Sequence, residues 1–269
     1  MIRLIWAAKP IDGITPGDLA KWRDELGATR KGSTVLRNMG LLSGVFTWAM
    51  KERGWIKTNP LALVSKPKHG EGRERTLSDA EWLCLMEAAS TSKATWLPAA
   101  LTVLAQSAMR RGELFGLRRT DVDYEARTAH LSTSKNGAAR RVPLCPVALA
   151  AMRSLDEQAA ERGDDSLLPC GAVASISTRF HTTVSRAQAI YRAECAASGA
   201  VPVASFLVDV RLHDLRHQAV TKWATAGFSV SELSAVSGHK SLALLQRYTH
   251  ISASGLASKM AKMAAREAT

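Results

Sequence analysis

The sequence predicts a mainly α-helical protein with one small antiparallel β-sheet, divided into two domains. Apolar residues recur at three- and four-residue spacing over much of the chain, which is the period of an amphipathic helix. An Asn-Gly pair at 136–137 lies between two short segments with β-type composition and indicates a hairpin. A polar, glycine-rich stretch at 69–76 has no apolar side chains to bury, so it is expected to link the two domains.

The first domain, residues 1–68, is expected to be helical. Thr15 is a good helix N-cap, because proline follows it and an aspartate stands three residues later. We expect this first helix to end at Gly27. A second helix is expected over 33–54, where apolar residues fall on one face, and a short apolar segment follows at 61–64.

The second domain, residues 77–269, is expected to open with a capping box formed by Ser78 and Glu81. Its last helix carries an apolar stripe that packs either on its own domain or on a neighbouring copy, and both alternatives stay open. Helices are expected over 78–90, 96–108, 112–118, 146–162, 174–198, 213–226, 229–236 and 253–267, and strands over 128–132 and 140–144.

Charge points to a polyanionic partner. The 269 residues carry a formal net charge of +12, with an isoelectric point near 9.9. Residues 1–75 hold 14 Lys and Arg against 7 Asp and Glu, a net of +7, and residues 76–269 hold 22 against 17, a net of +5. Both domains are therefore basic enough to attract nucleic acid.

The cysteines and the hydropathy predict a soluble protein of the cytoplasm, and the positive charge favours association with the nucleoid. The four cysteines stand at least 25 residues apart and lack zinc-site spacing, which favours reduced thiols. The apolar start of the chain is too short for a signal peptide, and no apolar run reaches the roughly 20 residues of a membrane span.

Tyr248 is the most informative residue, because basic motifs surround it in the sequence. His213 and Arg216 lie three residues apart at the start of an expected helix, so they share one face near the partial positive charge of its N-terminus. His239 follows a glycine at a helix break, and Arg110 comes from a different helix. Arginines and histidines that bind a phosphate, together with a phenol nucleophile, can cleave a phosphodiester without a metal. Each residue taken singly also has an ordinary structural explanation.

These motifs, in this order, resemble the tyrosine recombinases, also called the phage integrase family. The resemblance spans about residues 11–265. Within the family, the segment 37–68 and the tail after Tyr248 are most similar to shufflon-type and small phage-type integrases. The surrounding segments that carry it are 109–114, 134–137, 141–144, 213–217 and 237–241. The family pattern Arg…Lys…His-x-x-Arg…His…Tyr is matched by Arg110, Lys135, His213, Arg216, His239 and Tyr248.

The resemblance implies a fold and a mechanism. A SAM-like, core-binding helical domain would be followed by the catalytic domain. Tyr248 would attack a DNA phosphate and form a 3′-phosphotyrosyl bond, which a DNA 5′-hydroxyl later reverses. Arg110 and Arg216 would clamp the non-bridging oxygens. His213 and His239 would hydrogen-bond the same phosphate, with His213 as the candidate acceptor of the phenol proton.

The resemblance also implies Lys135 as the acid that protonates the leaving 5′-oxygen and Glu113 as a residue that orients an active-site group. It implies no metal or cofactor. The partner would be double-stranded DNA, bound by a tetramer in synapsis. The oligomeric state of the free chain stays open, with a monomer as one alternative.

Three positions depart from the family pattern. Ser107-Ala108 replaces the usual Thr-Gly before the first arginine, and Leu245 stands where threonine is common before the nucleophile. A further helix normally precedes Thr15, so either residues 1–14 replace it or the chain is truncated.

Four functions stay open from the sequence. The first is a catalytically active, site-specific recombinase that integrates, excises or inverts DNA, and the second is a DNA-binding remnant without activity. The third is a type IB topoisomerase-like enzyme that relaxes DNA, and the fourth is a basic helical scaffold for RNA or protein.

Overall fold

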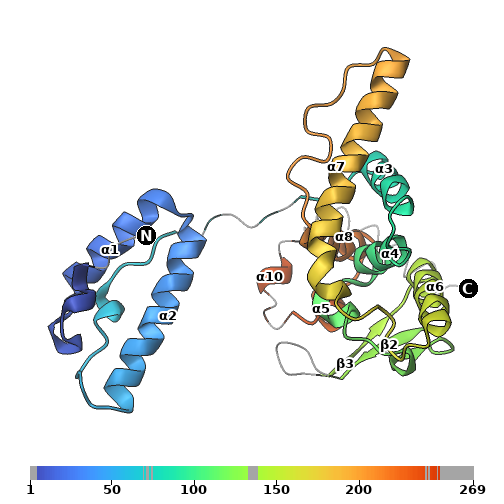
Figure 1. Cartoon of the computed structure of the whole chain (residues 1–269). Helices are drawn as coiled ribbons and strands as arrows, with labels where there is room; N and C mark the ends of the chain where they lie inside the picture. The colour runs from blue at the N-terminus through green and yellow to red at the C-terminus, as the bar shows by residue number, and fades with distance from the viewer. Residues whose placement is uncertain are drawn as a thin grey trace, which may run out of the picture. The chain divides into compact units, whose positions relative to one another are not determined.

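The computed structural model describes residues 5–68, 70, 73, 75–132, 139–239, 241, 243–246 and 248. The chain forms two compact units, Met1–Arg73 and Glu74–Thr269 (Figure 1). It is mainly helical and contains a three-stranded antiparallel sheet, so the predicted fold class is confirmed. Among the helices described, none combines the length and the apolar character that crossing a membrane requires.

The described part of the first unit contains two α-helices and three short 3₁₀ segments around a small apolar core. The two helices pack against each other and against the last 3₁₀ segment. The elements are η1 (Ile5–Ala8), η2 (Ile11–Gly13), α1 (Pro16–Thr29), α2 (Gly32–Lys51) and η3 (Pro60–Leu63). The core residues are Leu19, Trp22, Leu26, Val35, Met39, Phe46, Leu61 and Val64.

Helix α1 begins as predicted and ends later. The Thr15 hydroxyl accepts a hydrogen bond from the Asp18 amide at 3.2 Å, and the Asp18 carboxylate accepts one from the Thr15 amide at 3.0 Å. The expected stop at Gly27 is wrong. The Arg30 amide still donates to the Leu26 carbonyl, so the helical turn continues past the glycine.

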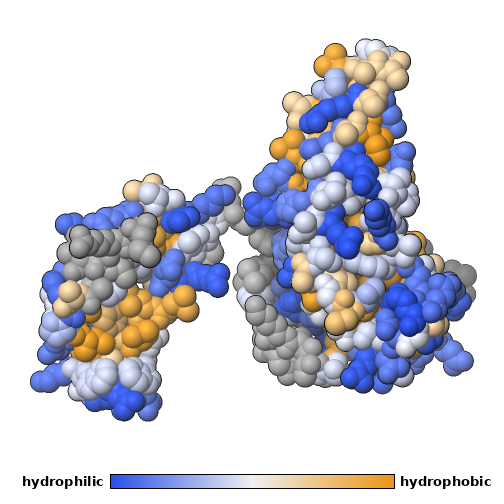
Figure 2. Space-filling view, viewed as in Figure 1, coloured by the Kyte–Doolittle hydropathy of each residue, from blue (hydrophilic) through white to orange (hydrophobic). Residues whose placement is uncertain are grey.

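One face of α2 remains apolar and exposed. Leu41, Val45 and Trp48 are 65%, 52% and 43% exposed and follow one another at four- and three-residue spacing. The Trp55 ring meets the Trp48 ring edge to face, and the Arg53 guanidinium lies 4.9 Å from the Trp48 ring centroid. Figure 2 shows apolar surface gathered on this unit.

The second unit is organised around α4, which is almost wholly buried. This helix packs against α6 and α8, while α3 packs against α7. The helices are α3 (Asp79–Ser90), α4 (Leu97–Ser107), α5 (Arg111–Leu114), η4 (Arg119–Asp121), α6 (Pro146–Arg162), α7 (Ala172–Ser198), α8 (Leu212–Thr225), α9 (Val230–Ser237) and α10 (Ala243–Gln246).

The sheet has the order β1-β2-β3, formed by Val122–Asp123, Thr128–Leu131 and Arg140–Pro143. Strands β2 and β3 correspond to the predicted hairpin. Strand β1 was not predicted, because two residues are too few to show a strand pattern in the sequence. Val122 pairs with Ala129, which pairs with Val142. All three are buried, so one face of the sheet covers the core.

Two other expectations differ from the structure or fall outside it. The helix expected over 112–118 is a single turn, α5, because the chain tightens into a turn at Phe115 and Gly116. The helix expected over 253–267 and the hairpin tip with Lys135 lie outside the described residues.

Candidate active site

The first arginine box folds into a sharp turn between α4 and α5. Ala108, which ends α4, has φ 54° and ψ 18°, a left-handed conformation that usually favours glycine. The Ser107 hydroxyl accepts a hydrogen bond from the Met109 amide at 3.3 Å. The turn places Arg110 as the N-cap of α5.

Glu113 holds two arginines at once. Its carboxylate accepts hydrogen bonds from Nη1 of Arg110 at 2.7 Å and from both Nη atoms of Arg140 at 2.9 and 2.8 Å. It also accepts from the Arg110 amide. Burial alone would raise the pKa of Glu113, but the hydrogen bonds from Arg140 and Arg110 outweigh it and lower the pKa to about 2. Glu113 therefore stays ionised and binds the guanidinium of Arg110.

Arg216 lies at the centre of the site and is only 3% exposed. It donates from Nη1 to the Ala108 carbonyl at 2.5 Å and from Nη2 to the Ser237 carbonyl at 2.7 Å. Burial, followed by the like charge of Arg110, lowers the pKa of Arg216 to about 10, so it remains a cation at neutral pH. A single buried guanidinium thus connects the end of α4 to the end of α9.

The turn after α9 presents His239. Arg110 donates from Nη2 to the Gly238 carbonyl at 3.1 Å, across 128 positions of sequence. The His239 ring lies with Nε2 3.3 Å from Nη2 of Arg216 and Nδ1 2.7 Å from the Ser237 hydroxyl. Arg216 and Ser237 therefore contact the His239 ring, and Arg110 binds the backbone of the residue before it.

Two features favour glycine at position 238. Its φ of +68° is a left-handed conformation that side chains disfavour. A Cβ atom here would also stand 2.7 Å from Nη1 of Arg140. Close approach of the Arg140 guanidinium therefore depends on the absence of a side chain.

Helix α8 contributes His213 beside Arg216. The ring is solvent-accessible at the edge of the site, yet partial removal of its water, followed by the positive charges of Arg216 and Arg110, lowers the pKa of His213. Asp214 opposes this shift. The neutral imidazole is therefore favoured, and it can accept a proton or donate one hydrogen bond.

Tyr248 lies after α10 and is half-buried against the core of the second unit. Leu245, at the position where the family commonly has threonine, is fully buried and anchors α10, and its carbonyl accepts a hydrogen bond from the Tyr248 amide at 2.9 Å. The Tyr248 hydroxyl is hydrogen-bonded to Nδ1 of His217. The phenol is thus held against α8, the helix that also carries His213 and Arg216.

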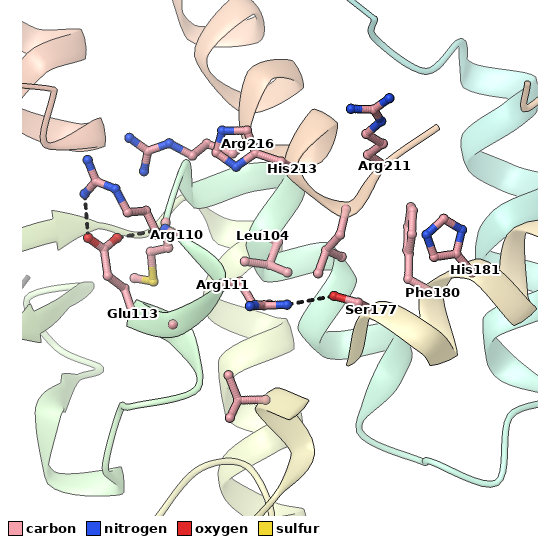
Figure 3. A pocket seen from close by; sticks show the side chains of 14 residues that line it. Leu104, Arg110, Arg111, Glu113, Ser177, Phe180, His181, Arg211, His213 and Arg216 are labelled. Carbon is pink, nitrogen blue, oxygen red and sulfur yellow. Dashed lines mark hydrogen bonds and ion pairs between the residues drawn. The ribbon is translucent and has the colours of Figure 1, made fainter. Parts of the chain in front are cut away.

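A pocket of about 730 Å³ opens beside this cluster (Figure 3). Arg110, His213 and Arg216 line one side of it, and Ser177 and His181 from α7 line the other. Arg111 reaches across to donate to the Ser177 hydroxyl at 2.7 Å, and Arg211 also lines the pocket. The lining is rich in cations, which suits a phosphate-bearing ligand.

The structure brings together Arg110, Glu113, His213, Arg216, His239 and Tyr248, and it leaves Lys135 outside the described residues. Sequence reasoning missed Arg140 and His217. A signal for Arg140 existed, because it stands two residues before buried Val142 and so faces inward from β3. An inward arginine needs a buried partner, here Glu113. His217 sits inside the segment quoted for the second motif but carried no assigned role.

Residues 75–254 match the phage integrase family. The chain is 32% identical over 263 residues to a shufflon-specific DNA recombinase of Escherichia coli, covering 94% of this chain and 62% of that relative, so it spans less than two thirds of the relative's length. Its fold is similar to the Tn1549 transposon integrase in complex with a circular intermediate DNA, with a TM-score of 0.70, 18% identity and coverage of 94% and 87%. It is also similar to a lambda integrase tetramer bound to a Holliday junction, with a TM-score of 0.65, 22% identity and coverage of 89% and 65%. The resemblance seen in the motifs is confirmed, and the chain belongs to the phage integrase family, the tyrosine recombinases.

Proposed function

We propose that this chain is a site-specific DNA recombinase that cleaves and rejoins DNA through a 3′-phosphotyrosyl bond on Tyr248. The observation that carries the proposal is the position of Arg216. It binds the backbone at both Ala108 and Ser237, while its own helix holds the Tyr248 phenol through His217. Motifs more than 100 positions apart thus converge on one cationic site beside a phenol.

The two arginines suit the stabilisation of a phosphoryl transition state. Arg110 and Arg216 are held by Glu113 and by backbone carbonyls, so little ordering remains to be done when DNA arrives. Arg110 and Arg140 share the carboxylate of Glu113, and Arg216 lies beside them on backbone carbonyls, so the three cations exceed the one anion and leave net positive charge for the non-bridging oxygens. Charge that grows on those oxygens would be stabilised in place.

Proton transfer is needed at both ends of the reaction. A tyrosine has a pKa near ~10 in water, so at neutral pH its phenol must lose a proton as it attacks. The leaving 5′-oxygen must gain one, and Lys135 is the proposed donor. The bond energy is kept in the phosphotyrosyl ester, so rejoining by a 5′-hydroxyl needs no ATP.

The first unit is proposed as the core-binding domain, which clamps the DNA. Its support is the charge of +7 on residues 1–75 and the helical fold around its own core. The proposed partner is double-stranded DNA, with four copies acting on two duplexes in synapsis, as the tetrameric lambda integrase on a Holliday junction suggests. Phosphate contacts would release counterions, so affinity for DNA should fall steeply as salt rises.

The test is capture of a covalent adduct from a library of nicked duplexes with randomised sequence. Cleavage near the nick frees a short strand, which traps the enzyme on its site. The wild-type chain should form an adduct that survives denaturation, and sequencing the trapped DNA identifies the site. Tyr248→Phe should form none. Tyr191→Phe is the same change at a tyrosine of α7 whose hydroxyl accepts a hydrogen bond from the Val203 amide, and it should form as much as wild type.

The other functions give different results in this assay. A DNA-binding remnant shifts duplex mobility but forms no adduct. A type IB-like enzyme forms the adduct and relaxes supercoiled plasmid, yet yields no recombinant product from two trapped sites. A scaffold for RNA or protein binds independently of Arg110. Absence of a Tyr248-dependent adduct would overturn the proposed function.

A further inference from the structure

The nucleophile candidate has a defined partner that the family resemblance did not assign. The hydroxyl of Tyr248 is hydrogen-bonded to Nδ1 of His217. The two rings are roughly parallel, with an interplanar angle of 24° and centroids 6.1 Å apart. The hydrogen bond and the ring geometry together place the imidazole edge against the reacting atom.

His217 belongs to the same helical face as the phosphate-binding residues of α8. It stands one turn after His213, and the two imidazole rings meet edge to face with centroids 4.9 Å apart. Arg216, between them in sequence, is buried in the centre of the site. The chain of rings therefore runs from the phenol through His217 to His213 at the pocket.

The atom through which His217 contacts the phenol, Nδ1, determines whether the imidazole can accept the phenol proton. A neutral imidazole with its hydrogen on Nε2 offers Nδ1 as an acceptor, so the phenol donates its O–H to it. Such an arrangement is the geometry expected of a general base, within hydrogen-bond reach of the proton it removes.

We propose that His217 is the catalytic base for strand cleavage, a role that the resemblance had suggested for His213. This inference rests on the proposed function, in which Tyr248 is the nucleophile. As the bond from Oη to phosphorus forms, the phenol proton moves to Nδ1 of His217 and the bond from phosphorus to O5′ breaks. The leaving O5′ takes its proton from a separate donor, Lys135. On rejoining, His217 returns its proton to Oη, and His213 is left to hydrogen-bond the phosphate.

The experiment measures single-turnover cleavage of the DNA site recovered in the adduct assay, at saturating enzyme. The variants are His217→Ala and His217→Gln, with His130→Ala as the control. His130 is an exposed histidine of β2 outside the pocket and the catalytic cluster. Each is assayed on normal DNA and on DNA whose scissile 5′-oxygen is replaced by sulfur. A 5′-thiolate leaves without protonation, so this substrate bypasses the acid but not the base.

We expect His217→Ala to slow cleavage about 10²-fold to 10⁴-fold on both substrates, the usual contribution of general acid–base catalysis. Added imidazole should restore part of the rate, in proportion to its concentration. His217→Gln can accept the phenol hydrogen bond but cannot take its proton, so it should remain slow. The His130→Ala control should cleave like wild type, and all variants should bind DNA with affinity within about threefold of wild type.

Three results would overturn the inference while leaving the proposed function intact. The first is a wild-type rate in His217→Ala, together with normal adduct formation. The second is full recovery of His217→Ala on the sulfur substrate, which would place His217 on the leaving-group side. The third is a wild-type rate in His217→Gln, which would reduce His217 to a positioning residue. Absence of any adduct with the wild-type chain would instead overturn both.

Discussion

The Arg140 guanidinium donates two hydrogen bonds to the Glu113 carboxylate, at 2.9 and 2.8 Å. Arg140 reaches it from β3, and Glu113 comes from the turn of helix that carries Arg110. The Glu113 side chain is 5% exposed and that of Arg140 12%, so the pair is shielded from water. The sheet thus contributes to the position of Arg110, although none of the motifs that identified the site pointed to Arg140.

Arg140→Ala should destabilise the second unit by about 3 kcal/mol, because it leaves a buried carboxylate with one partner fewer. Arg141→Ala removes the next, exposed arginine of the same strand and should change stability by less than about 0.5 kcal/mol. Urea unfolding of both variants measures the difference. Equal effects would show that the pairing with Glu113 contributes nothing specific.

Local signals in the sequence were enough to predict most of the fold. Thr15 and Ser78 cap their helices through the expected capping boxes, because such signals involve residues three apart. Gly27 shows the limit of this reasoning. It reads as a stop, but no neighbouring atom lies within 4 Å of a Cβ built there, and the helix continues. The length of α5 was overestimated for a similar reason, since the end of this one-turn helix depends on a tight turn at Gly116.

The site residues were predicted from an ordered set of residue types. The contacts that hold them in place could not be predicted. Contacts such as that between Arg110 and the Gly238 carbonyl join residues 128 positions apart, and nothing in the local sequence encodes them. Arg140 was visible only as an arginine that alternates inward beside Val142. His217 was hidden by proximity to stronger motif residues, although it lies one turn from His213 on the same helix.

Glu113→Gln should weaken the dependence of stability on acid. The pKa of Glu113 is lowered to about 2 in the folded protein, so its ionised form adds stability above the ordinary pKa of a glutamate, near ~4.3. That stability is lost as pH falls toward 2, and amounts to at most about 3 kcal/mol, from a shift of about two pKa units. Unfolding free energy, measured from pH 6 to pH 3, should fall less in Glu113→Gln than in wild type. Parallel curves would contradict the assignment.

Gly238→Ala should impair the site more than a comparable change at Gly163. Both glycines are left-handed, with φ of +68° and +70°, and each ends a helix. Alanine costs about 1–2 kcal/mol in that conformation at either position. Only at Gly238 does the new Cβ meet Arg140, at 2.7 Å, whereas nothing lies within 4 Å at Gly163.

The excess effect at Gly238 is measured by two assays. Thermal unfolding should show a larger loss for Gly238→Ala than for Gly163→Ala. Adduct formation should fall only in Gly238→Ala, because displaced Arg140 and His239 disturb the phosphate site. A Gly163→Ala variant equally slow in cleavage would indicate that backbone strain alone, and not the contact with Arg140, sets the effect.

Arg110 and Arg111 are neighbours of the same type with different expected roles, so Arg→Lys at each position forms a matched pair. Arg110 is fixed by Glu113 and the Gly238 carbonyl, whereas Arg111 is exposed and contacts Ser177 across the pocket. Lysine keeps the charge but loses the planar fork that binds two oxygens. Arg110→Lys should therefore slow single-turnover cleavage by at least about 10²-fold, with little change in DNA affinity.

Arg111→Lys should cleave and bind like wild type, because an exposed point charge is all that a backbone phosphate requires there. Arg111→Ala should weaken DNA binding and reduce the slope of log affinity against log salt by about 1, while cleavage at saturating enzyme stays unchanged. Fluorescence anisotropy at several salt concentrations measures the slope, and the adduct assay measures cleavage. If Arg110→Lys lost affinity rather than rate, the arginine would serve to hold the DNA, and transition-state stabilisation would fall to Arg216 alone.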